Sequence, residues 1–170
     1  YQAVAKGKAM DFIVQKAAEL GVHRIVPVLS ERSVPDWDDL KTTAKVDKWR
    51  SICVESIKQC GSAWLPRVEL PMNPRDALTD SHQTELALIA TLQSDAKHPR
   101  EYIDTYSTEH GQAPDKLAIW IGPEGDYTPA EINPIRTGAL PVTLGPLVLR
   151  SETAAIYCLS VLNYELQSHH

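Results

Sequence analysis

Two segments of the sequence carry the residue types from which a ligand site is most readily built. The first, residues 119–125, is an apolar run that ends in the turn Gly122-Pro123-Glu124-Gly125. The second, residues 144–154, contains Gly145-Pro146 and then leads into an apolar helical pattern. Glycine lets backbone amides approach a ligand closely, and ligands of open α/β sheets bind beyond the carboxyl ends of strands. Each segment alone is also compatible with an ordinary strand-to-helix turn.

Charged and hydroxyl side chains gather at the start of the helix predicted in the second segment. Arg150, Glu152 and Thr153 lie around its first turn, where free amides and the helix dipole favour an anion or a polar ligand. The same pattern also fits a surface ion pair between Arg150 and Glu152.

Several common catalytic motifs are absent from the sequence. It has no Gly-x-Gly-x-x-Gly fingerprint, P-loop, His-Glu-x-x-His or Gly-x-Ser-x-Gly motif, which weighs against dehydrogenases, kinases, metalloproteases and α/β-hydrolases. The histidines are scattered and are expected at surface or capping positions. Cys53, Cys60 and Cys158 lack metal-type spacing, so we expect no metal and three buried thiols in a reducing compartment.

Length and charge limit the class of protein further. A chain of 170 residues fits a single domain. Its net charge is −5, whereas nucleic-acid binders are usually basic, so an RNA partner would need a local basic patch or a segment outside this sequence. Charges spaced along the N-terminal part of the chain are candidates for such a patch, although charges in this pattern more often form a solvated face. They are Lys6, Lys8, Lys16, Arg24 and Arg32.

The sequence gives no sign of a membrane segment. Its longest apolar runs, such as Leu86–Ala90, are about five residues long, whereas a membrane helix needs about 20. No signal peptide is visible, and we expect a cytoplasmic protein.

Helical and strand-like patterns alternate along the chain, which predicts an α/β fold with a mostly parallel sheet. Ser151 is the expected N-cap of the last helix, and Pro134 should shorten the helix before it. The abrupt start at Tyr1 suggests a domain taken from a longer protein. Helices are predicted over residues 8–20 and 44–60 and from residues 129 and 151, and strands over residues 1–5, 24–29, 67–70, 86–90, 116–121 and 141–144.

Motifs along nearly the whole chain resemble, in order, those of the ribosomal RNA small-subunit methyltransferase E family. The match includes the segments 6–11, 15–22 and 30–33, then Trp49, Glu55, Gln59-Cys60-Gly61 and Pro66 of the second helix and its exit, and finally 121–125 and 144–154. Three positions depart from the family pattern. Asp126 replaces a second glycine, Leu147 replaces a basic residue, and Ser151 replaces a threonine.

The resemblance implies a SPOUT-type fold, in which helices flank a mostly parallel sheet and the C-terminal segment threads a trefoil knot. It implies S-adenosyl-L-methionine as cofactor, a homodimer with the active site near its interface, and methylation of a uridine at N3 in 16S ribosomal RNA of the small subunit. Residues 1–168 would form the methyltransferase domain, without the N-terminal RNA-binding barrel of the family, and residues 169–170 would be a possible tag remnant.

Two sets of site residues follow from the resemblance and the motifs. For catalysis we predict Arg150, to orient the uridine or a phosphate, and Glu124 or Glu152, to take the N3 proton. The predicted cofactor-binding residues are Leu92, Ile121, Gly122, Pro123, Glu124, Gly125, Leu144, Gly145, Leu149, Arg150, Thr153 and Ala154. Two alternatives stay open: another SPOUT-class methyltransferase of tRNA or rRNA, or a non-catalytic RNA-binding protein that kept the fold.

Overall fold

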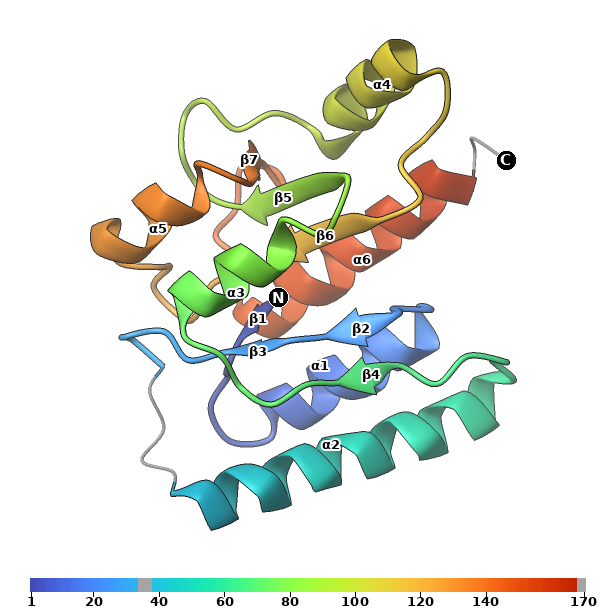
Figure 1. Ribbon diagram of the computed structural model, residues 1–170, viewed down its shortest axis with the longest axis vertical. Coiled ribbons are helices and arrows are strands. Elements are labelled where there is room, and N and C mark those ends of the chain that lie inside the picture. Colours follow the sequence, from blue (N-terminus) through green and yellow to red (C-terminus); the bar gives the residue numbers. More distant parts are fainter. Residues whose placement is uncertain (34–37, 168–170) are drawn as a thin grey trace.

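The computed structural model describes residues 1–33 and 38–167, in which parallel strands form a layer with helices on both sides (Figure 1). The strands are β1 (Gln2–Ala3), β2 (Arg24–Ile25), β3 (Pro27–Val28), β4 (Arg67–Val68), β5 (Leu86–Ala90), β6 (Leu117–Trp120) and β7 (Leu140–Val142). The helices are α1 (Ala9–Glu19), α2 (Asp39–Cys60), α3 (Pro74–Ser81), α4 (Pro99–His110), α5 (Pro129–Ile135) and α6 (Ser151–Gln167). The predicted α/β class is confirmed, whereas the knot stays a prediction. Among the described helices, none combines the length and the apolar character that crossing a bilayer requires.

All strand pairs of the described chain are parallel. β5 lies between β6 and β7 in one sheet, and two smaller sheets pair β1 with β3 and β2 with β4. Isolated bridges from Gln2 to Ile121 and from Val28 to Met72 extend the pairing across the sheets. The result is one nearly continuous parallel layer, so that the carboxyl ends of neighbouring strands open to the same edge.

Both faces of the central strand β5 are buried. Ala87 and Ile89 belong to a core cluster with α3 and α5, whereas Leu86 and Leu88 pack in a cluster with α1, α4 and α6. This double burial explains why the strand is an uninterrupted apolar run rather than an alternating one. The predicted bounds of the strand, residues 86–90, are confirmed.

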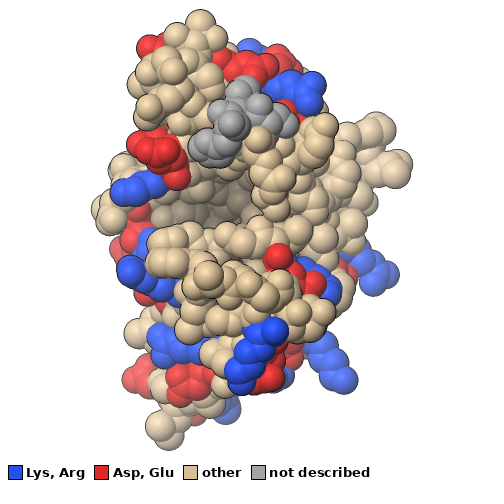
Figure 2. All heavy atoms as spheres, turned by 90° about the vertical axis from the view of Figure 1, so that its right-hand side faces the viewer, with Lys and Arg blue, Asp and Glu red and all other residues tan. Residues whose placement is uncertain are grey.

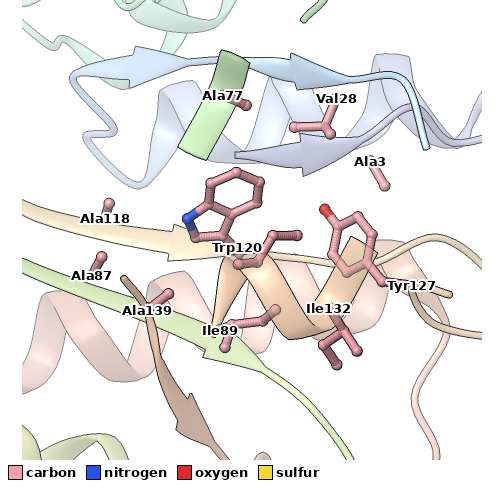
Figure 3. Packing of buried hydrophobic residues seen from close by; sticks show 11 residues of the cluster. Ala3, Val28, Ala77, Ala87, Ile89, Ala118, Trp120, Tyr127, Ile132 and Ala139 are labelled. Atoms are coloured by element: carbon pink, nitrogen blue, oxygen red, sulfur yellow. The ribbon is translucent and has the colours of Figure 1, made fainter. Parts of the chain in front are cut away.

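Trp120 fills the core between β6 and the helices α3 and α5 (Figure 3). Its side chain is fully buried and stacks on Tyr1 with ring centroids 4.6 Å apart. Small side chains surround the indole and leave room for it at interior packing density. These are Ala77, Ala87, Ala118 and Ala139.

Helix starts were the least accurate part of the sequence prediction. α2 begins at Asp39 rather than at residue 44, because the Asp38 side chain caps it by accepting a hydrogen bond from the Lys41 amide at 2.8 Å. α3 and α4 were not predicted. Their sequence signal is a capping residue followed by proline at the first helical position: Asn73-Pro74 and His98-Pro99.

Other local expectations were closer to the structure. The short helix α5 has the predicted capping box between Thr128 and Glu131 and ends one residue after Pro134. The strand expected at 24–29 divides into β2 and β3, and the strand expected at 141–144 is β7, one residue earlier at its start. His169 and His170 lie outside the described residues.

The cysteine expectation is correct for two of the three side chains. Cys53 and Cys158 are buried free thiols, and burial raises the pKa of Cys53 to about 11 and that of Cys158 to about 12. Cys60 is exposed, so its predicted burial is wrong. It is the last residue of α2 and lies just before Gly61, beyond the part of the helix that packs on α1.

An ion-pair network fastens α3 to the strands. The Arg24 guanidinium donates to Asp80 at 2.6 and 3.1 Å and to Glu69 at 2.7 Å, and the Tyr1 hydroxyl donates to Asp80 at 2.6 Å. The hydrogen bonds from Arg24, and next those from Tyr1, hold the pKa of Asp80 below its usual value, while burial acts in the opposite direction. The carboxylate therefore stabilises the fold in its charged form.

We expect Asp80→Asn to lower the free energy of unfolding at pH 7 by about 1–2 kcal/mol, because charge-assisted hydrogen bonds are lost. Since the folded-state pKa of Asp80 is depressed, its contribution is fully present above the unfolded value near 4 and is lost as the pH falls through the folded value. The difference between wild type and variant in urea denaturation should therefore shrink between pH 5 and pH 3. The exposed Glu109→Gln serves as control, and a difference that does not change with pH would contradict the assignment.

Candidate functional site

A small pocket lies at the carboxyl ends of β5 and β6, with a cavity volume of about 120 Å³. Its walls come from the ends of β5 and β6, from the loop between β7 and α6, and from the first turn of α6. The two segments singled out in the sequence therefore meet in one site. The lining residues are Ala90, Thr91, Leu92, Ile121, Gly122, Pro123, Gly125, Asp126, Leu144, Gly145, Leu147, Val148, Leu149, Ser151 and Ala154.

Most of the predicted cofactor residues line this pocket, but three do not. Glu124, Arg150 and Thr153 lie on the same segments without lining the cavity, and all three are exposed. Their ligand-binding role stays a prediction, as it does for the lining residues.

Sequence reasoning missed six lining residues. Ala90 and Thr91 follow a predicted parallel strand directly, so the rule that ligands bind beyond strand ends could have found them. The remaining four sit inside or next to the chosen motifs and could have been found by including whole loops: Asp126, Leu147, Val148 and Ser151.

The charged candidates for catalysis are sequence neighbours of lining residues and do not line the cavity themselves. Glu124 is exposed and Glu152 is half-buried. Within residues 1–33 and 38–167, no ion pair joins Arg150 to Glu152, so the surface pair considered from the sequence does not form. The Arg150 side chain is exposed, and the residue lies between the lining residues Leu149 and Ser151, one residue before α6 begins.

Ser151 connects three segments of the site, although the sequence predicted it only as an N-cap. It is buried as the first residue of α6, and its hydroxyl donates to the Gly122 carbonyl at 2.9 Å. The Gln2 amide of β1 in turn donates to the Ser151 Oγ at 2.9 Å. The expected capping role is wrong because the hydroxyl bonds other segments instead of its own helix.

The loop after β3 supports the β6–α5 loop from outside. The Arg32 guanidinium donates to the carbonyl oxygens of Gly125 and Asp126, and the Glu31 amide donates to Glu131 Oε1 at 2.8 Å. Glu131 is buried, and its other oxygen accepts from the Thr128 amide at 2.9 Å. The loop that carries Gly122 and Gly125 is thus fixed at several points.

The predicted basic face is not one free surface. Lys16 pairs with Glu19 and Arg24 pairs with Glu69 and Asp80, while Arg32 bonds the backbone of the neighbouring loop. Figure 2 likewise shows a face on which acidic and basic side chains are interspersed. Of the five predicted residues, Lys6 and Lys8 form no ion pair within the described chain, and both are exposed.

Backbone geometry at the β6–α5 loop needs small or special residues. Gly125 has φ +85° and Asp126 has φ +67°. Both values lie in the left-handed region, which residues other than glycine, asparagine and aspartate rarely adopt. A Cβ on Gly122 would lie 3.0 Å from Asp126 Oδ1. Gly122 therefore lets Asp126 fold back over the loop.

The pocket is suited to a ligand that is partly apolar and forms hydrogen bonds with backbone groups. Apart from Asp126, the described residues that line it carry no ionisable side chain. Its volume is below the roughly 300–1,000 Å³ typical of small-molecule sites. Two of its lining residues, Leu147 and Val148, are 71% and 78% exposed. A nucleoside-sized ligand would extend onto these two side chains. The described chain has no cluster of His, Cys, Asp and Glu that could hold a metal ion.

Comparison with known proteins gives consistent matches over most of the chain. A family model described as an RNA methyltransferase domain matches residues 1–163. Ribosomal RNA small subunit methyltransferase E of Bacillus subtilis is 31% identical over 165 residues, which make up 95% of this chain and 63% of the relative.

Solved structures share the fold. A methyltransferase from Legionella pneumophila in complex with the cofactor SAM is 37% identical, with a TM-score of 0.85 over 96% of this chain and 64% of that one. A ribosomal RNA small subunit methyltransferase E from Neisseria gonorrhoeae, bound to S-adenosyl methionine, is 27% identical, with a TM-score of 0.77 over 96% of this chain and 63% of that one. The chain thus spans slightly less than two thirds of the length of these relatives.

We expect Ser151→Ala to lower the free energy of unfolding by about 1–3 kcal/mol, because it leaves the Gly122 carbonyl without its partner in a buried place. Urea denaturation measures the effect. Ser151→Thr, which keeps the hydroxyl, should stay within about 1 kcal/mol of wild type.

Ser160→Ala is the matched control, since the Ser160 hydroxyl bonds only the Ile156 carbonyl of its own helix and is exposed. Equal losses for Ser151→Ala and Ser160→Ala would show that the bridge to Gly122 contributes nothing to stability.

Proposed function

The chain belongs to the RNA methyltransferase domain family, and from that membership we propose that it transfers a methyl group from S-adenosyl-L-methionine to N3 of a uridine in 16S ribosomal RNA. The observation that carries the proposal is the meeting of the segments 121–126 and 144–154 in one pocket. The relatives named ribosomal RNA small subunit methyltransferase E support the choice of substrate.

The lining of the pocket fits the proposed cofactor in its chemistry. The apolar side chains of Leu92, Ile121 and Leu149 offer surfaces for a flat purine ring, and Gly122 and Gly145 expose their backbone to a ligand. The amides and carbonyls of these loops are suited to the ring nitrogens and the exocyclic amine. When bound, S-adenosylmethionine supplies a methyl group activated by its positively charged sulfur.

The chain itself has to position the uridine and move one proton. Holding the uridine base in a fixed orientation against the cofactor site would provide much of the rate, because positioning removes the entropic cost of bringing two molecules together. Arg150 is our candidate to hold a uracil carbonyl or a phosphate. Glu124 or Glu152 takes the N3 proton.

Exposed apolar side chains of the β7–α6 loop and of α6 support a second part of the proposal. Leu147, Val148 and Tyr157 are all exposed, and groups of exposed apolar residues commonly mark interfaces. We propose that they lie in a homodimer interface close to the active site and that the segment between β7 and α6 threads a trefoil knot. Action on ribosomal RNA would place the protein in the cytoplasm.

Calorimetry should detect binding of S-adenosylmethionine by the purified chain, with a dissociation constant on the order of micromolar. Absence of binding would contradict both the proposed reaction and the other SPOUT-class enzyme, and would favour a non-catalytic RNA-binding protein. If S-adenosylmethionine binds, mass spectrometry of ribosomal RNA from cells lacking the gene would identify the modified nucleotide.

Arg150→Ala should lower methylation of small ribosomal subunits on the order of 100-fold, because a positioned cation for the substrate is lost. The side chain is exposed and forms no ion pair with Glu152, so the melting temperature should not change. Lys116→Ala is the control, because Lys116 is exposed and lies just before β6, at the opposite end of this strand from the pocket. Wild-type turnover by Arg150→Ala would remove Arg150 from the mechanism.

Glu124→Gln and Glu152→Gln separate the two candidates for the base. The variant that lacks the base should lose about 100-fold or more in turnover, while S-adenosylmethionine binding stays within about threefold of wild type. The other variant should retain most of the activity. If both variants turn over normally, neither carboxylate takes the proton.

A further inference from the structure

One ionisable side chain lies in the wall of an otherwise uncharged pocket. Among the described residues that line the cavity, Asp126 is the sole acid and no base is present. Its Oδ1 accepts a hydrogen bond from the Tyr127 amide at 2.8 Å and lies against Gly122, another lining residue. The carboxylate is thus held at the wall formed by the β6–α5 loop.

Among the described residues, no basic side chain forms an ion pair with this carboxylate. Ion pairs there involve other acids, and the nearby Arg32 donates to the backbone carbonyls of Gly125 and Asp126. The negative charge of Asp126 is therefore available to a ligand. An unpaired charge beside apolar walls acts more strongly on a ligand charge than it would in water.

Asp126 adopts a left-handed φ of +67°, a region that aspartate and asparagine tolerate better than other residues with a Cβ. Glycine would adopt the same conformation freely. Asp126 thus places a carboxylate where a glycine would leave the wall neutral.

We propose that Asp126 makes the pocket select the cationic sulfonium cofactor over its neutral thioether product, S-adenosylhomocysteine; this inference rests on the proposed function. Methyl transfer forms a bond between N3 and the methyl carbon and breaks the bond between that carbon and sulfur. The electron pair stays on sulfur, which becomes neutral, and the N3 proton leaves to the base. The attraction between Asp126 and the ligand weakens in that step, which favours release of the product.

The two ligands form a natural test, because they share the adenosine and the amino-acid part and differ by the methyl group and the charge at sulfur. Asp126→Asn keeps an acceptor for the Tyr127 amide and a side chain that tolerates the left-handed region, but removes the charge. Calorimetry on the purified chain should show that the preference for S-adenosylmethionine over S-adenosylhomocysteine falls roughly tenfold in the variant, equal to about 1.4 kcal/mol. The loss should come from weaker binding of S-adenosylmethionine.

Two further variants separate the charge of Asp126 from its effect on the shape of the loop. Asp126→Gly, which adopts the left-handed conformation freely, should lose the same preference even if Asp126→Asn folds poorly. Glu31→Gln removes an exposed carboxylate from the adjoining loop and should leave the preference unchanged. An amine analogue of the cofactor, with an ammonium-bearing carbon in place of the sulfonium, should follow S-adenosylmethionine because it is also a cation.

The outcomes distinguish a failure of this inference from a failure of the proposed function. If the wild-type chain binds neither ligand, the proposed function fails, and this inference fails with it. If the wild type binds both ligands and both Asp126 variants retain its preference, or weaken the two ligands equally, Asp126 only shapes the loop and the inference is overturned while the proposed function stands.

Discussion

The parallel pairing of β5 with two neighbours determines where the site can be. Ile89 is in register with Trp120 on one side, and Ala90 with Val142 on the other. Three strands therefore end at one edge, and the loops that follow them have to share the space beyond it. Because β7 lies on the far side of β5 from β6, the chain must cross this edge again to reach the start of α6.

Polar contacts secure that return of the chain in addition to the packing of Leu144 and Ala154. Ser151 bonds Gly122 and accepts from Gln2, so the first residue of α6 contacts both β1 and the β6–α5 loop. Arg32 and Glu131 hold the same loop from the β3 side. The pocket itself can then remain apolar, with Asp126 as its one charged group among the described lining residues, because its walls are supported from behind.

The sequence was sufficient for the class of fold and for the two main walls of the site. Apolar strands with both faces buried, and glycine-proline turns before helices, leave strong local signals, as at Leu86–Ala90 and Gly122-Pro123. Ser151 and Asp126 show what local signals cannot supply. The partner of the Ser151 hydroxyl is Gln2, which is 149 positions away in sequence, and the role of Asp126 depends on which other side chains share its wall. Helix α2 begins at Asp39, five residues before its predicted start, for a similar reason. Its capping residue Asp38 lies outside the apolar pattern from which the helix was predicted.

The position of β1 has a consequence for how the protein is made. Its two edges are covered by β3 and by Ile121, whose amide and carbonyl bond the backbones of Tyr1 and Ala3. During synthesis the first edge is covered early, but the second stays open until Ile121 has left the ribosome. An uncovered strand edge is a template for pairing with other chains. The nascent polypeptide therefore carries an open strand edge, and with it a risk of aggregation, from the emergence of β3 until that of Ile121.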